Sequence, residues 1–495
     1  MAFINAISQD TNKTAYTENG ALSYKSTLNH VLDFFSKSGA LRDNPNDALD
    51  YFMKAYAEDK TLADKALFYC RDIREGQGER KNFKHILRWL ATRHTEEFKA
   101  NIKLIPEYGR WDDLYNLINT PLENDALEIM KQQFFEDLNK LETNDDEKVI
   151  PISLIGKWLK SENTSSGESQ KLAKITRKYF NLNPKEYRQA LSKLRTRIEI
   201  VEKYMCQGEW NKINYEHVPS KALKQYTKAF DKHDSQRYKE YINNVKKGKA
   251  KINTGTLYPY DIVKNYIKKS IRPEDDETLN ELWKHLPDYF DSDENVMCVI
   301  DVSGSMYNFK TIRPIDVAVS LGLYMAERNK GPFKNHFITF SENPEFIEVI
   351  GNDLYEKIHN ITMANWGFST NLVKVFDLIL NTAVKYQLKQ KELPTKLFII
   401  SDMQFNKATG FNENYKTVFE VIDQMFKDNG YKRPELVFWN VNAKSDSPIQ
   451  KNEIGTYLIS GISPSILKNA LKCTSLTPID LMLEALNGER YKEII

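Results

Sequence analysis

The stretch Val296–Ser305, VMCVIDVSGS, decides the fold. Its first part is a short run rich in Val and Ile, which is typical of a buried strand. Similar runs occur at 336–341 (HFITFS), 396–402 (KLFIISD) and 435–441 (ELVFWNV), and they alternate with helical stretches at 314–328 and 370–387. Buried strands that alternate with helices predict a parallel sheet covered by helices on both faces. We therefore expect a doubly wound α/β domain over residues 293–495.

Residues 1–292 follow a different, helical pattern. Apolar residues recur three and four positions apart in segments at 28–37, 47–59, 61–73 and 82–94. Successive helices with short breaks favour stacked helix pairs, as in an α-solenoid. Because a solenoid that closes must join its ends, we also expect the N- and C-terminal segments to meet.

Length and composition narrow the class of protein. A chain of 495 residues with 41% hydrophobic residues is too long for one ordinary core and too apolar to be disordered. It contains no apolar run of the roughly 18 residues that a membrane span needs, and MAFINAISQDTNKT does not resemble a secretory signal. The four cysteines lie far apart, which argues against a disulfide framework and a cysteine zinc site. These features predict a cytoplasmic protein.

The small net charge of +2 hides a strong asymmetry. Residues 151–272 contain 27 Lys and Arg but only 11 Asp and Glu, so this block carries a net charge of +16. The preceding residues carry −6 and the following residues carry −8. A basic block of this size indicates a polyanionic partner such as RNA. The alternative is a lysine-rich helical surface that is merely solvated.

Five residues form a candidate metal site. Asp301, Ser303 and Ser305 follow the first strand in a D-x-S-x-S loop, at the edge where doubly wound sheets place ligands. Asp402 ends a second strand at the same edge, and Thr370 lies near the start of a helix. Hard oxygen ligands suit Mg²⁺, with Ca²⁺ and Mn²⁺ as alternatives. The competing interpretation is a capped turn next to a strand-end aspartate.

This segment resembles a von Willebrand factor A domain with its metal-ion-dependent adhesion site. In that family the D-x-S-x-S loop, a threonine and a later aspartate share one divalent cation, and an open coordination position accepts an acidic group from a partner. The resemblance assigns these roles to Asp301, Ser303, Ser305, Thr370 and Asp402. Met403 stands where the family usually has a small Gly.

The helical half carries a second resemblance. Three motifs are similar to the TROVE module of Ro-type RNA-binding proteins: ALFYCRDIREGQGER at 66–80, IPEYGRWDDL at 105–114 and SLIGKWL at 153–159. In those proteins an A domain follows the module, and segments at 301–306, 339–344 and 437–440 look closest to a largely uncharacterised branch. The resemblance implies that residues 1–292 form HEAT-like helical repeats that close into a ring. It also implies that single-stranded RNA ends or small structured RNAs bind to this helical part.

The cations expected to contact RNA lie on two consecutive helices. They are spaced three and four residues apart in the first helix and can neutralise phosphates without reading bases. The candidates are Lys171, Lys174, Arg177, Lys178, Arg188, Lys193, Arg195 and Arg197. Tyr179, Phe180 and Tyr187 could stack on unpaired bases, but they fit the pattern of core residues better. The glycine-rich Gly76–Lys81 segment is expected to be a structural turn.

The leading hypothesis is a monomeric cytosolic RNA-binding protein without catalytic activity, in which the metal-bearing A domain is a scaffold or docks a partner. The alternative is a protein-interaction module that binds an acidic ligand through the metal. A third class is a metal-dependent hydrolase that uses Asp301, although no catalytic His or nucleophile elbow accompanies it.

Overall fold

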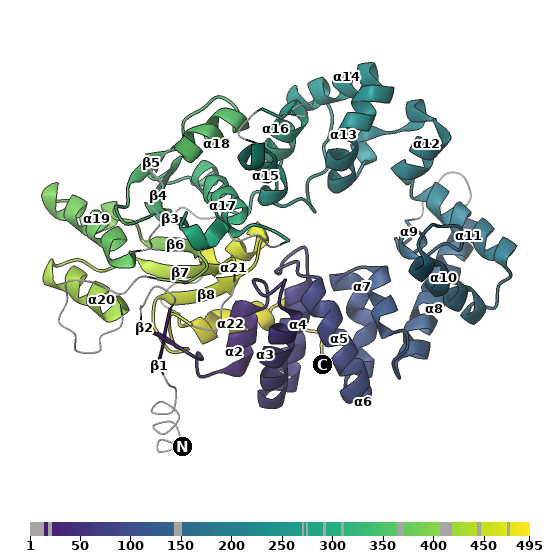
Figure 1. The fold of residues 1–495 in the computed structure, drawn as a ribbon, viewed down its shortest axis with the longest axis horizontal. Coiled ribbons are helices and arrows are strands. Elements are labelled where there is room, and N and C mark those ends of the chain that lie inside the picture. The colour runs from purple at the N-terminus through teal and green to yellow at the C-terminus, as the bar shows by residue number, and fades with distance from the viewer. Residues whose placement is uncertain are drawn as a thin grey trace. The chain divides into compact units, whose positions relative to one another are not determined.

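The fold is taken from a computed structural model of the chain. It describes residues 14–17, 22–142, 151–269, 272–273, 276–290, 294–307, 311–363, 371–405, 418–442, 447–472 and 476–495. The chain forms two compact units (Figure 1). One comprises Met1–Asn82 and Thr254–Glu493, and the other comprises Phe83–Asn253 with Ile494–Ile495. The change of sequence pattern at residue 292 lies inside the first unit, because the N-terminal helices pack with the α/β part.

The α/β part is a six-stranded sheet with the strand order β5-β4-β3-β6-β7-β8. All neighbouring strands are parallel except β5, which pairs antiparallel with β4 at one edge. The strands are β3 (Val296–Asp301), β4 (His336–Phe340), β5 (Phe346–Glu348), β6 (Lys396–Ser401), β7 (Glu435–Asn440) and β8 (Thr456–Ser460). A helical part followed by an α/β sheet confirms the predicted fold class at this level, and β5 and β8 are strands that the sequence patterns did not indicate.

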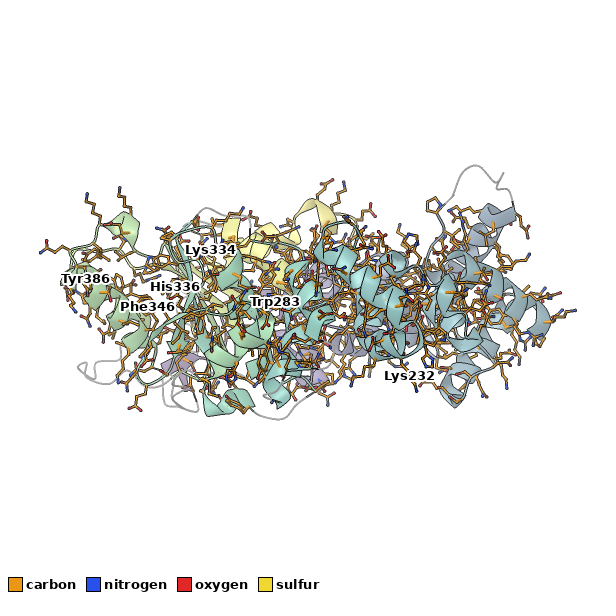
Figure 2. The ribbon with its side chains drawn as sticks, turned by 90° about the horizontal axis from the view of Figure 1, so that it is seen from above. Lys232, Trp283, Lys334, His336, Phe346 and Tyr386 are labelled. Atoms are coloured by element: carbon orange, nitrogen blue, oxygen red, sulfur yellow. The ribbon has the colours of Figure 1, made fainter. Side chains whose placement is uncertain are left out.

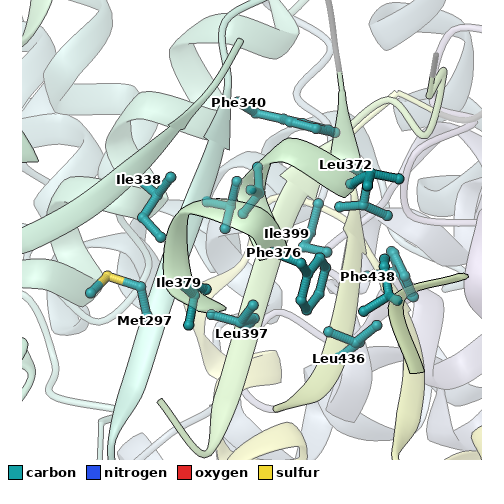
Figure 3. Close-up of a cluster of buried hydrophobic side chains, with 14 of the residues drawn as sticks. Met297, Ile338, Phe340, Leu372, Phe376, Ile379, Leu397, Ile399, Leu436 and Phe438 are labelled. Carbon is teal, nitrogen blue, oxygen red and sulfur yellow. The ribbon is translucent and has the colours of Figure 1, made fainter. Parts of the chain in front are cut away.

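Helices cover both faces of this sheet. They are α17 (Pro314–Arg328), α18 (Leu354–Met363), α19 (Leu372–Lys385), α20 (Val418–Asp428), α21 (Leu467–Lys472) and α22 (Pro478–Leu486). On one face, strand residues such as Val299 and Ile399 pack against Phe376 of α19 in a single apolar core (Figure 3). On the other face α17 approaches closely at Gly322, where a Cβ would lie 2.1 Å from Ile300. Strands with two buried faces account for the continuous apolar runs in the sequence.

The N-terminal segment joins the C-terminal part of the chain in the same unit. The N-terminal segment contains β1 (Thr14–Tyr16), β2 (Leu22–Tyr24), α2 (His30–Lys37), α3 (Pro45–Glu58) and α4 (Lys60–Arg71). Two further helices of this unit, α15 (Pro259–Lys269) and α16 (Asp276–Lys284), precede the sheet in the chain. The buried carboxylate of Asp72 accepts hydrogen bonds from Arg490 and from the Tyr491 hydroxyl. The expectation that the terminal segments meet is therefore confirmed.

The glycine-rich turn after α4 has a structural role in this contact. The backbone N–H groups of Gln77, Gly78 and Glu79 donate to carbonyl oxygens of residues 69–72. The buried Gln77 side chain donates to the carbonyl of Phe35 and to Ser460. These donors are used within the protein, so the segment is a structural turn, as expected.

In the residues of the second unit that the structure describes, all regular elements are helices. Apart from short 3₁₀ turns, its helices are α5 (Lys81–Arg93), α6 (Thr95–Phe98), α7 (Ile105–Tyr108), α8 (Glu123–Glu142), α9 (Ile155–Trp158), α10 (Gly167–Tyr179), α11 (Pro184–Arg197), α12 (Val201–Gln207), α13 (Ser220–His233) and α14 (Ser235–Lys246). The first two residues of α5 belong to the first unit. The core of the second unit includes Phe134, Phe180 and Tyr187 in mutual ring contact. Phe180 and Tyr187 are thus core residues, as the sequence pattern favoured.

The surface of the α/β part carries isolated aromatic side chains. Phe346 of β5 and Tyr386 after α19 are 41% and 63% exposed (Figure 2). Single exposed apolar residues are common on protein surfaces and need no special explanation. In the part of the chain that the structure describes, no helix has the length and apolar content that would let it cross a bilayer.

Candidate metal centre and candidate nucleic-acid interface

The first candidate site lies where the order of strand connections reverses. The chain passes from β3 to β4 on one side and later returns to β6 on the other side of β3. Ligands in open α/β sheets bind at the carboxyl ends of the two strands beside such a reversal. Asp301 is the last residue of β3, and Asp402 directly follows β6, which pairs with β3. The parallel pairing therefore places both carboxylates at one edge, as predicted.

The serines of the loop lie beside Asp301. The Ser303 backbone N–H donates to Oδ1 of Asp301 at 2.9 Å, and the Ser303 and Ser305 hydroxyl oxygens are 3.1 Å apart. Asp301, Ser303 and Asp402 are buried, whereas Ser305 is half-buried and Gly304 is exposed. Four of the five predicted ligands thus belong to one sheet edge, and its loop side is open to solvent. The fifth, Thr370, lies outside the described residues.

The electrostatics of this edge are unfavourable for two bare carboxylates. Burial and the negative charge of Asp402 raise the pKa of Asp301 to about 7, although hydrogen bonds from Ser401 and Ser303 act against this rise. Two buried like charges of this kind are stabilised by a bound cation. The donor set of carboxylates and hydroxyls is one that Mg²⁺ accepts. The residues present therefore fit a divalent cation.

Two features of the site were not predicted from the sequence. The Ser401 hydroxyl donates to Oδ2 of Asp301 and accepts from the N–H of Met403 at 3.0 Å. The only sequence signal for Ser401 is its position as the strand residue before Asp402. Met403 itself has a φ of 65°, in the left-handed region that favours glycine. Its buried side chain packs into the sheet core, which compensates for the unfavourable backbone.

Other kinds of metal site find no support among the residues that the structure describes. There, no group of three or more His, Cys, Asp or Glu side chains lies close enough to hold an ion. The site at the sheet edge differs in chemistry, because its donors are two carboxylates and serine hydroxyls.

The second candidate site is the cationic face of α10. Lys171, Lys174 and Lys178 are exposed and border one shallow groove along this helix. The side chain of none of these three lysines makes an ion pair or hydrogen bond with another described residue. The spacing of three and four residues thus puts three uncompensated positive charges on one side, as the sequence indicated.

Two of the predicted cations have structural contacts instead. Arg177 forms an ion pair with Glu162 at 2.6 Å and donates to the carbonyl of Leu182. Arg195 donates to the carbonyls of Gly156 and Leu159 and to the Ser161 hydroxyl. These contacts hold α10 and α11 against the segment before α10, so both guanidinium groups are less available to a ligand.

The remaining cations of α11 differ in exposure. Arg188 is exposed and makes no hydrogen bond or ion pair with any described residue. Lys193 is exposed and lies 3.8 Å from Glu142, and Arg197 is half-buried. Among the predicted cations, those that are exposed and have no described side-chain partner are therefore Lys171, Lys174, Lys178 and Arg188.

Two family models match this chain, and the boundary between them lies near residue 292, where the sequence pattern changes. A family model described as domain of unknown function (DUF2828) matches residues 17–149 and 128–289, and another described as domain of unknown function (DUF7788) matches 295–489. An uncharacterized protein, L728 of Acanthamoeba polyphaga mimivirus, is 30% identical over 95% of this chain and 87% of its own length.

Among solved structures, the crystal structure of the Deinococcus radiodurans Ro (RSR) protein matches over 93% of each chain, with 13% identity and a TM-score of 0.39. At that distance the likeness supports no functional assignment. The family models match most of the chain, and the mimiviral relative matches nearly all of it, so these two comparisons identify the family of this protein. The chain belongs to the family defined by the domain of unknown function DUF2828, followed here by a DUF7788 region.

Proposed function

We propose that this protein is a cytoplasmic, Ro-like RNA-binding protein whose helical unit binds RNA phosphates. The observation that carries the proposal is the exposed, uncompensated row Lys171, Lys174 and Lys178 on α10, within a block of charge +16. Phosphates are the ligand that such a row fits, because they present negative charge at regular spacing and need no shaped pocket. Contacts to phosphates carry no sequence information, so binding has weak sequence preference. The proposed function includes no catalytic step.

The α/β part has a separate role in this proposal. Asp301, Ser303, Ser305, Thr370 and Asp402 hold one divalent cation, with Mg²⁺ preferred, in an arrangement like that of a von Willebrand factor A domain. The cation would balance the two buried carboxylates and polarise an oxygen ligand. In this proposal, an acidic group from a protein partner completes the coordination of the cation.

The RNA proposal is tested by the salt dependence of binding. Log affinity for a single-stranded RNA should fall linearly with log salt, by roughly 0.7 per phosphate contact. A triple variant with Lys171→Gln, Lys174→Gln and Lys178→Gln should lower this slope by about 2. Fluorescence anisotropy of a labelled oligonucleotide measures the slope.

A matched triple variant provides the control. Lys334→Gln, Lys385→Gln and Lys391→Gln remove the same charge from exposed positions of the α/β part. This control should leave the slope unchanged. Equal slopes for the α10 variant and the wild type, or an absence of RNA binding at low salt, would refute the proposal.

The alternative function is a protein-interaction module that acts through the metal. It is favoured by one observation, namely the two loop hydroxyls beside a buried carboxylate on a solvent-facing loop. The two functions respond differently to a chelator. Removal of the metal should leave RNA affinity nearly unchanged, whereas it should abolish binding of an acidic protein partner.

A further inference from the structure

The second unit contains a pocket beside α11. It has a volume of about 660 Å³ and lies between the segment 157–163, helix α11 and helix α12. This volume is in the range of pockets that hold small organic groups. The sequence patterns gave no sign of the pocket, because its walls come from three separate segments.

The walls of the pocket are fixed to one another. Arg195 of α11 holds the segment 156–161 through three hydrogen bonds. Lys203 of α12 donates to the Thr196 hydroxyl of α11 at 2.7 Å. The Tyr187 hydroxyl donates to the carbonyl of Lys160 at 2.9 Å, which fixes the ring that borders the pocket. A ligand would therefore meet a preformed cavity and would not need to order it.

The chemistry of the lining is mixed. Apolar surface comes from Pro184, Tyr187, Leu191 and Ile200. Lys157, Arg188, Arg195 and Lys203 supply twice as many positive charges as Glu162 and Glu202 supply negative ones, and Glu162 is already paired with Arg177. Asn163 and Gln207 contribute amide groups, and Ser161 and Ser192 complete the lining.

We propose that this pocket receives one unpaired nucleobase of the bound RNA. A flat base fits against the apolar wall, and the amide and carboxylate groups can bond to its edge. Arg188, which is exposed and uncompensated, is placed to contact the adjoining phosphate. The carboxylate of Glu202 accepts from base amino groups but repels acidic side chains, so RNA suits the lining better than an acidic peptide does. This inference rests on the proposed RNA binding and adds that single strands are preferred through their bases.

The test compares two probes of equal charge. One is a short single-stranded oligoribonucleotide, and the other is an abasic ribose-phosphate strand of the same length. Wild-type protein should bind the RNA roughly 10-fold more tightly than the abasic strand, because accommodating one base contributes a factor of this order. Equal affinity for both probes would overturn the pocket proposal and leave the phosphate proposal intact. If neither probe binds, the proposed function itself fails.

Two exposed positions of α11 provide a matched pair of variants. Ser192→Trp places a large side chain at the pocket, whereas Gln189→Trp adds the same side chain at a position that does not line it. Ser192→Trp should remove the preference for RNA over the abasic strand, and Gln189→Trp should retain it. An unchanged preference in Ser192→Trp would contradict the proposal.

A charge variant gives a second, independent measurement. Arg188→Gln should lower the salt slope for RNA by about 0.7, whereas Lys185→Gln, an exposed position outside the pocket, should leave it unchanged. Equal slopes for the two variants would show that Arg188 does not contact the phosphate beside the base.

Discussion

Replacement of Asp301 by Asn should stabilise the metal-free protein and abolish its stabilisation by Mg²⁺. Asp301 is fully buried, and burial together with the charge of Asp402 raises its pKa from 3.8 to about 7. One pKa unit corresponds to 1.36 kcal/mol, so ionisation of this carboxyl in the folded protein costs up to about 4 kcal/mol. Asn has the same shape without the charge. Its Oδ1 can still accept from the N–H of Ser303, and its amide N–H can donate to the Ser401 hydroxyl oxygen, which can reverse its role from donor to acceptor.

In the metal-free wild type the charge of Asp301 destabilises the folded protein, whereas a bound cation stabilises it. A ligand that binds only the folded state at 100 times its Kd stabilises that state by about 2.7 kcal/mol. Wild-type protein should therefore gain Tm on addition of Mg²⁺, whereas Asp301→Asn should start from a higher Tm in chelator and gain nothing. Differential scanning calorimetry with and without EDTA measures both values.

A second buried aspartate gives a control of opposite sign. Asp137 is also fully buried, but it accepts hydrogen bonds from the N–H and the hydroxyl of Ser153. Asp137→Asn turns an acceptor group partly into a donor and should lower the Tm. If Asp301→Asn also lowers the metal-free Tm, the argument from repulsion between the carboxylates is wrong. If Mg²⁺ still raises the Tm of Asp301→Asn as much as that of the wild type, the metal assignment is wrong.

Three further predictions concern stability. Asp72→Ala removes the buried partner of Arg490 and should cost roughly 3 kcal/mol in urea unfolding; a loss near zero would show that the terminal contact is unimportant. Burial raises the pKa of Asp33, but hydrogen bonds led by His30 outweigh it and hold that pKa below 3.8. The stability from Asp33 is therefore present above pH 3.8 and lost below it, so Asp33→Asn should flatten the acid side of a Tm–pH profile, and an unaltered profile would contradict this. Gly322→Ala pushes a Cβ against Ile300 and should cost about 1–3 kcal/mol by chemical denaturation, whereas an unchanged midpoint would mean that α17 can shift.

The fold class and the sheet edge that carries the two carboxylates were predictable because both depend on local pattern. A buried parallel strand reads as a continuous apolar run, and residues that follow such strands must lie at one edge. The order of the predicted strands was sufficient to bring Asp301 and Asp402 to that edge. The hydroxyl of Ser401 was not predicted, because its contact with Asp301 spans 100 residues and depends on the register of β3 with β6.

The basic face was predictable in outline and not in detail. Helical spacing puts Lys171, Lys174 and Lys178 on one side of α10, and the structure agrees. The same spacing includes Arg177, yet its partner Glu162 lies 15 residues earlier in a non-helical segment. Which cation is paired depends on how that segment folds back, and no periodic pattern contains this information.

The sequence by itself determined the alternation of elements, the edge that carries the carboxylates and the position of the basic block. Each of these follows from the chemistry of residues that are neighbours along the chain. The tertiary structure alone decided which residues join the N-terminal helices to the C-terminal end of the chain, among them Asp72 and Tyr491, which are 419 residues apart. It also decided the pocket beside α11. Contacts of this kind depend on which surfaces bury each other once all elements are present, and that outcome is a property of the whole packed chain.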